Sequence, residues 1–170
     1  MLKKWIKLIF VSLLFIAAQV WLFNPISLFR YATPFIYPVL LLMFPINTGT
    51  GALTLFGFFT GLAIDALSGT PGLHTSAFTA TAFLRNTLIR PFLGDNILEE
   101  GTVGQNMSNT RFYLLLLKIL VVHLLLLMLL DAFSLFDPLY LLLRFCACVA
   151  LSYMISVIIF LITGSSHRIS

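Results

Sequence analysis

Charged residues are scarce along this chain. Only 9% of its 170 residues are Asp, Glu, Lys or Arg, whereas soluble domains usually carry about 25%. A surface that faces water cannot be built from so few charges, so lipid must be the main solvent of the folded chain. The one sizeable polar segment, 94–110, is a loop, which leaves no room for a soluble catalytic domain.

Cysteine is also rare, and the two cysteines, Cys146 and Cys148, lie in one apolar run. Residues two apart point in different directions on a helix. No CxxC pair for redox chemistry or zinc binding is present. We therefore predict two small apolar residues that fill space.

What the chain does contain is apolar sequence, which makes up 60% of its residues. At about 20 residues for each membrane-spanning helix, the chain has room for six or seven spans joined by short loops. The sequence therefore predicts an all-α integral membrane protein, a bundle of about six transmembrane helices forming a single domain over 1–170. The expected helices cover about 5–23, 33–46, 51–68, 73–92, 111–131 and 139–163.

The N-terminal segment resembles a signal peptide in one respect, because lysines precede its apolar run. That run is long and bulky, has Trp5 and Trp21 at its two ends, and is not followed by a clear small-x-small cleavage site. We expect a retained first helix with an aromatic anchor at each membrane interface.

The second apolar stretch is the least regular. It is bracketed by Pro34 and Pro45 and contains Pro38, and proline disrupts the interior of a helix. It is also too short to cross a membrane without tilting. The sequence leaves open whether 34–46 is a full span, a kinked helix or a partly re-entrant element.

Basic residues are unevenly distributed between the helix ends. With a cytoplasmic N-terminus, only Arg30 and Arg144 fall on the outer side. Those on the cytoplasmic side are Lys3, Lys4, Lys7, Arg85, Arg90, Arg111 and Arg168. Basic residues favour the cytoplasmic side, and an even number of spans returns the chain to the side where it began. We therefore predict a multi-pass protein with both termini in the cytoplasm.

Three residues spaced by four, Gly57, Gly61 and Asp65, share one face of the third expected helix. Two glycines at this spacing allow close helix contact in a membrane. A carboxylate within a spanning helix is costly and usually has a partner. Asp65 could bond to the backbone of the turn that contains Ser68 and Thr70, or it could bind a partner; the sequence leaves both roles open.

The fourth expected helix carries His74, Thr81 and Arg85 on one face, because these residues are seven and four apart. Arg85 lies about 16 Å along the helix from His74, which is short of the ~30 Å hydrocarbon core. We expect Arg85 either to extend its side chain to the cytoplasmic surface or to be buried beside an acid. Glu99 and Glu100 are the candidate acids.

No arrangement of residues predicts catalysis. Asp65 lacks the second carboxylate of an aspartyl protease, since Asp131 and Asp137 lie in a loop without a motif. No GxSxG or HExxH motif is present. Three scattered histidines do not make a metal site, and we expect His123 to pack against or bond to a neighbouring helix. The prediction is a protein that is not an enzyme and has no cofactor, catalytic residue or metal site.

The residues 57–65, GFFTGLAID, followed by GTPGLH at 69–74, resemble the rod shape-determining protein MreD family. Members share a glycine, an aspartate four residues later, and a short turn leading to Gly-Leu and a new helix. Gly61, Asp65 and Gly72 with Leu73 occupy those places. The length and the near absence of soluble loops are also similar to this family.

The resemblance implies a non-catalytic scaffold of the bacterial inner membrane that takes part in lateral peptidoglycan synthesis and cell shape. Its partner would be an MreC-like protein with a single spanning helix. Further partners would be RodA with a class B penicillin-binding protein and, indirectly, MreB. The chain would contact membrane lipid and would not bind nucleic acid. The candidate partner-binding or structural residues are Gly57, Gly61, Asp65, Gly72, His74 and Arg85.

The family fold resembles the substrate-binding S-component of energy-coupling-factor transporters, which gives an alternative function. The chain would then bind a small molecule as the membrane subunit of such a transporter. S-components typically present an Ala-x-x-x-Ala surface on the first helix to their coupling partner. Here that helix has only the adjacent Ala17 and Ala18, which weakens the alternative.

Overall fold

The computed structural model describes residues 2–25, 33–93, 101–105, 107–131 and 138–164. In these residues the chain forms six α-helices and no β-strand. The α-helices are α1 (Leu2–Ala18), α2 (Leu40–Met43), α3 (Thr50–Ser68), α4 (Leu73–Ile89), α5 (Asn109–Asp131) and α6 (Pro138–Gly164). The short turns are the π-helical η1 (Gln19–Phe23) and the 3-10 turns η2 (Tyr37–Val39), η3 (Arg90–Phe92) and η4 (Val103–Gln105).

The predicted all-α class is confirmed. Five of the six expected helices coincide with α1, α3, α4, α5 and α6 to within about three residues, once η1 and η3 are counted with the helices they continue. Asn24-Pro25 follows the first helix at the expected place, because proline does not continue a helix cheaply. The expected helix over 33–46 is different, and only 37–43 within it is helical.

Three helices in the described part of the chain are long and apolar enough to cross a membrane, namely α3, α5 and α6. The apolar part of the first helix, Leu8–Phe23, is shorter. Large apolar side chains cover the outside of the bundle: the exposed fraction is 68% for Phe10, 63% for Phe59 and 71% for Ile162. Water would not stabilise such a surface, and lipid does.

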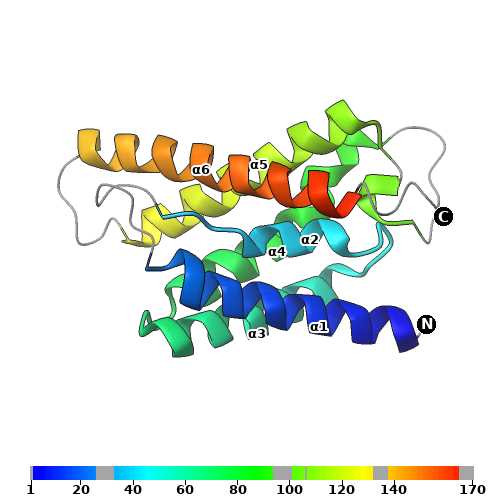
Figure 1. The fold of residues 1–170 in the computed structure, drawn as a ribbon, viewed down its shortest axis with the longest axis horizontal. Helices are drawn as coiled ribbons and strands as arrows, with labels where there is room; N and C mark the ends of the chain where they lie inside the picture. The colour runs from blue at the N-terminus through cyan, green and yellow to red at the C-terminus, as the bar shows by residue number, and fades with distance from the viewer. Residues whose placement is uncertain (1, 26–32, 94–100, 106, 132–137, 165–170) are drawn as a thin grey trace.

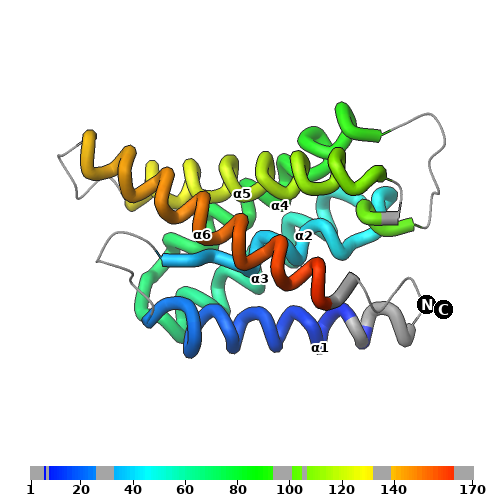
Figure 2. Tube along the Cα trace, turned by 45° about the horizontal axis from the view of Figure 1, so that its top comes forward, coloured from blue at the N-terminus to red at the C-terminus, as the bar shows by residue number. Residues whose placement is uncertain are grey.

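The helices run back and forth along one long axis (Figure 1). We call one end of the bundle the basic end, because α1 with its lysines and α5 with Arg111 begin there. The other end is called the turn end, after the turn at 69–72 between α3 and α4. The last turn of α6 lies at the basic end with the first turn of α1 (Figures 1 and 2). α3 and α4 form the most extensive pair of helices.

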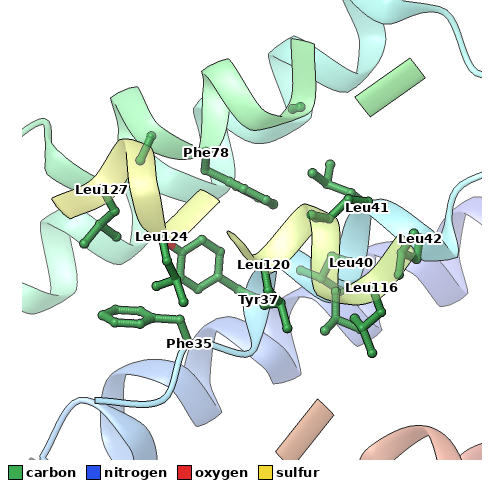
Figure 3. Close-up of a cluster of buried hydrophobic side chains, with 14 of the residues drawn as sticks. Phe35, Tyr37, Leu40, Leu41, Leu42, Phe78, Leu116, Leu120, Leu124 and Leu127 are labelled. Atoms are coloured by element: carbon green, nitrogen blue, oxygen red, sulfur yellow. The ribbon is translucent and has the colours of Figure 1, made fainter. Parts of the chain in front are cut away.

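Residues 33–46, called here the central segment, run between the helices as an irregular chain (Figure 1). Residues 33–36 have no helical structure, η2 and α2 follow, and Phe44 returns to an extended conformation with φ −74° and ψ 147°. Tyr37, Leu40 and Leu41 are fully buried. Figure 3 shows these side chains among Phe78 and the leucines of α5. The central segment therefore lies in the core of the bundle. The expected helix bounds of 33–46 were too wide, and among the alternatives left open the structure shows an irregular element that is helical only over 37–43.

Side chains of other elements satisfy the non-helical backbone of the central segment. Phe35 N–H donates to Ser152 Oγ of α6 at 2.8 Å, and Ile36 N–H donates to Gln19 Oε1 at 2.9 Å. The amide nitrogen of Gln19 donates to the carbonyl oxygen of Pro34 at 3.0 Å. Irregular backbone at membrane depth is tolerated only where protein covers it and supplies such partners. These bonds explain how Pro34 and Pro38 are accommodated inside the bundle.

Candidate functional site

The two glycines of α3 bring its backbone against α4. A Cβ atom built on Gly57 would lie 2.7 Å from Ala82 Cβ and 2.9 Å from Phe78 O. A Cβ on Gly61 would lie 2.6 Å from Thr75 Cα. Any larger residue would therefore force the helices apart. The prediction that these glycines permit close packing is confirmed.

Asp65 lies one helical turn after Gly61 and is 4% exposed. Its Oδ1 atom accepts from His74 N–H at 3.0 Å and from Thr70 Oγ1 at 2.9 Å. Its Oδ2 atom accepts from Thr75 N–H at 2.9 Å and from Thr75 Oγ1 at 2.6 Å. The N–H groups in the first turn of a helix have no partner within the helix, and a carboxylate is favoured at this end. Asp65 therefore caps α4 from the preceding helix.

The turn between α3 and α4 requires glycine at two positions. Gly69 ends α3 with φ 69°, and Gly72 precedes α4 with φ 83°. Both conformations are left-handed, and glycine adopts them without steric cost. The N–H groups of Gly69 and Thr70 both donate to Asp65 O, so the backbone of Asp65 ends α3 while its side chain begins α4. The open alternative in which Asp65 fixes the following turn is the one observed.

Beside this cap, polar side chains from three elements meet inside the bundle. Tyr37 Oη lies 2.9 Å from His74 Nδ1 and 2.6 Å from His123 Nε2. His123 Nδ1 lies 3.0 Å from Thr81 Oγ1, which donates to Ala77 O at 2.7 Å. Of the four side chains in this chain of contacts, those of Tyr37, Thr81 and His123 are fully buried, and that of His74 is 4% exposed. We call His74, Tyr37, His123 and Thr81 the polar relay.

Arg85 is fully buried on the same face of α4. Its guanidinium donates to the carbonyl oxygens of Leu41 at 3.1 Å and Phe44 at 2.8 Å, and to Asn86 Oδ1 at 2.9 Å. A longer contact of 3.4 Å reaches Ile46 O. Carbonyls at the C-terminal end of a helix lack helical partners and attract a cation. Arg85 thus holds the end of α2.

Of the two alternatives for Arg85, extension to the cytoplasmic surface was wrong and burial is observed, with carbonyls at the end of α2 as its partners. The proposed acids Glu99 and Glu100 lie outside the described residues. The shared face of His74, Thr81 and Arg85 is confirmed, since all three side chains are buried. His123 bonds to α4 through Thr81, as expected of a histidine between helices.

Two residues in the interior of the bundle, Tyr37 and Gln19, were not predicted from the sequence. Tyr37 joins the two histidines. Gln19 donates to Pro34 O and accepts from Ile36 N–H, one residue on each side of Phe35. The available signal was a polar side chain inside an apolar run, which is costly unless it is paired. The two cysteines point in different directions as expected, because Cys148 is buried and Cys146 is exposed. The expected role of filling space therefore applies to Cys148 and was wrong for Cys146.

A shallow hollow of about 410 Å³ lies on the outer surface between α3 and α4. Its lining includes Phe58 and Phe83 together with small residues such as Ser76 and Ala80. The hydroxyls of Thr54 and Thr79 in this lining donate to carbonyls of their own helices. The hollow therefore belongs to the outer surface of the bundle, apart from the polar relay.

No family of known proteins, no characterised protein and no solved structure matches this chain.

Proposed function

We propose that this chain is a scaffold of the MreD type in a bacterial inner membrane, where it binds an MreC-like protein with a single spanning helix. In this proposal it crosses the membrane about six times and carries no catalysis. It contributes to cell shape by holding components of lateral peptidoglycan synthesis together, including RodA with a class B penicillin-binding protein and, indirectly, MreB.

One observation carries the proposal. The residues on which the resemblance rests act as a single structural unit: Gly61 admits the backbone of α4, Asp65 caps that helix, and Gly72 makes the turn between them. The members of the pattern are thus joined in one helix–turn–helix unit, as a shared structural role for them requires. The unit fixes α3 and α4 as a rigid pair, which suits a protein that presents surfaces to other membrane proteins.

The packing of the interior supports a scaffold over a transporter subunit. A site for a small molecule is usually a concave cavity that buries most of the ligand. Here the central segment occupies the middle of the bundle, and Tyr37, Leu40 and Leu41 leave no exposed surface. Every fully buried polar side-chain atom in the described residues already has a hydrogen-bond partner.

The distribution of charge supports the proposed orientation. Arg90 and Arg111 lie at the basic end, where α1 begins and α6 ends. Arg144, near the turn end, forms an ion pair with Asp131 at 2.7 Å. Basic residues gather on the cytoplasmic side of membrane proteins, and the basic end has more of them, so it would face the cytoplasm.

Co-purification tests the scaffold. The native chain carrying an affinity tag is produced together with an MreC-like protein from the same organism, extracted in mild detergent and separated by size. We expect the two proteins to migrate together, and an unrelated single-span protein of similar length to be left behind. Separate migration of the native pair would contradict the scaffold.

The same preparation tests the transporter alternative. Small molecules released from the purified chain by denaturation are identified by mass spectrometry. We expect no vitamin-like compound in proportion to the protein. Such a compound at one molecule per chain, together with failure to bind the MreC-like partner, would overturn the proposal in favour of a binding subunit.

A further inference from the structure

The donor and acceptor in each hydrogen bond of the polar relay can be assigned by counting the available protons. Thr81 has one hydroxyl proton, and it donates that proton to Ala77 O at 2.7 Å. The oxygen of Thr81 therefore meets His123 Nδ1 with a lone pair, so that nitrogen must carry a hydrogen.

The remaining bonds of the relay are then fixed. A neutral His123 with a proton on Nδ1 has a bare Nε2 atom, which accepts the hydroxyl proton of Tyr37 across 2.6 Å. The oxygen of Tyr37 can then only accept from His74 Nδ1 across 2.9 Å. His74 Nδ1 therefore carries the proton of that neutral ring, and its Nε2 atom is bare.

The bare Nε2 atom of His74 is also the part of the relay that reaches the outside. No hydrogen bond is formed by this atom in the described part of the chain, although every fully buried polar side-chain atom there has a partner. His74 Nε2 is therefore not fully enclosed, in agreement with the 4% exposure of the residue. It lies at the turn end, two residues after Gly72.

We propose that His74 Nε2 is a proton-binding site at the turn end of the bundle, and that Tyr37, His123 and Thr81 are positioning residues that keep this nitrogen bare. A proton from the aqueous side adds to the lone pair of Nε2, and no other bond changes. The ring becomes an imidazolium whose Nδ1–H still donates to Tyr37. The inference concerns the ligand of this one atom and does not depend on the proposed scaffold.

Burial and the nearby acids act in opposite directions on a proton bound at His74. Burial has the larger effect and disfavours the charged ring, whereas Asp65 on α3 and Asp131 on α5 favour it electrostatically. The other groups facing it are uncharged in the resting state, namely Tyr37 of the central segment and His123 of α5. Arg85, on α4 itself, is occupied by the carbonyls after α2. The two acids therefore offset part of the cost of placing a charge on the buried ring of His74.

The proton does not continue beyond His74. The next position along the relay is His123, which is fully buried and has His74 itself as the charged group acting on it. The last bond ends on Ala77 O, which has no proton to pass on. The relay therefore fixes the tautomer of His74 and is closed at its inner end.

Nitrogen NMR on the histidine rings tests this assignment. The full-length chain is labelled with ¹⁵N-histidine in lipid nanodiscs and followed from about pH 8 to about pH 4.5, an interval that brackets ordinary histidine titration. At high pH we expect His74 and His123 both to have a protonated Nδ1 and a bare Nε2. On acidification the bare-nitrogen signal of His74 is lost, and that of His123 stays.

Tyr37→Phe removes the acceptor for His74 Nδ1 while keeping the ring that packs in the core. We expect the neutral His74 of this variant to lose its fixed tautomer, so that proton density appears on Nε2 at high pH. Tyr153→Phe is the matched control, because Tyr153 lies on α6 outside the relay. It should leave both histidine signals unchanged.

Three results would overturn the proposal. In the native chain, a bare Nδ1 on His123 would mean that the relay runs in the other direction. A bare-nitrogen signal of His74 that persists to the lowest pH would mean that no proton binds. Proton flux through the native chain in liposomes, above that of empty liposomes, would mean that the relay is open at its inner end. The native measurements decide these points even if Tyr37→Phe fails to fold.

Discussion

Gln19 uses both ends of its amide on the backbone of the central segment, as donor to Pro34 O and acceptor from Ile36 N–H. Asp65 accepts from N–H groups in the first turn of α4, and Arg85 donates to carbonyls that follow α2. Each of these polar side chains thus serves backbone that helical bonding leaves unpaired. In lipid such unpaired groups cost several kcal/mol each, so these side chains stabilise the bundle even without an ion pair.

At the residue scale, Gly61→Ala should destabilise the bundle. The added methyl would lie 2.6 Å from Thr75 Cα and 2.7 Å from His74 O, and these backbone atoms can yield only if α4 moves. We expect the free energy of unfolding to fall by about 1–3 kcal/mol, the usual cost of overpacking. The measurement is thermal or denaturant unfolding in detergent, followed by circular dichroism.

Gly51→Ala is the matched control on the same helix, because a Cβ at Gly51 meets nothing within 4 Å. The free energy of unfolding should stay within about 1 kcal/mol of the native value, since alanine favours a helix by about that amount over glycine. Equal loss of stability in the two variants would argue against a close approach of α3 and α4 at Gly61.

At the scale of elements, the central segment depends on side chains that arrive from elsewhere. In Ser152→Ala the buried N–H of Phe35 loses its acceptor. An unsatisfied buried donor costs about 1–3 kcal/mol, so we expect a lower melting temperature. The reporter is Cys148, which is buried beside Ser152 on α6. In a Cys146→Ser background, a thiol-reactive dye labels Cys148 as the bundle unfolds.

Ser156→Ala separates this effect from the loss of any buried hydroxyl. Ser156 is fully buried like Ser152, but its hydroxyl donates to Ser152 O within α6. The melting temperature of this variant should stay close to that of the Cys146→Ser parent. If Ser152→Ala melted no earlier than Ser156→Ala, the bond between α6 and the central segment would not contribute to stability.

The sequence predicted the regular elements well and the central segment poorly, for a physical reason. Apolar runs ending at Asn24-Pro25 and at Gly69 mark helices locally, because the breaking residues act on their own backbone. Three prolines marked 34–46 as irregular without giving its path. That path depends on Ser152, which is 117 positions from Phe35, and no local pattern encodes such a distance.

The residues of the candidate site were likewise predicted in part. The shared face of His74, Thr81 and Arg85 followed from the helical period, and the buried positions of all three agree with it. Tyr37 could not be assigned to the same site, because a single tyrosine beside Pro38 does not belong to any periodic pattern in the sequence. Its role follows only from the packing of η2 against α4 and α5, which brings its hydroxyl between the two histidines.

At the scale of the whole molecule, the bundle has an asymmetry of charge along its long axis. The first turn of α1 and the last turn of α6 share the basic end, where Arg90 and Arg111 also lie. Near the turn end, Arg144 is the basic residue of α6 and forms an ion pair with Asp131 at 2.7 Å. Positive charge near the ends of spanning helices sets the orientation at insertion.

This asymmetry predicts that both ends of the chain face the cytoplasm. A fluorescent protein that matures only in the cytoplasm, fused after Ser170, should be bright, and alkaline phosphatase fused at the same place should be inactive. For the turn end, a single cysteine is introduced at Thr70 in a background with Cys146→Ser and Cys148→Ser. This cysteine should be labelled when whole cells are treated with a membrane-impermeant thiol reagent. Thr70 lies in the turn between α3 and α4, which would then face outward with His74. An active phosphatase fusion, or a Thr70→Cys variant protected from the reagent, would require the bundle to sit the other way up, and the bare nitrogen of His74 would then face the cytoplasm.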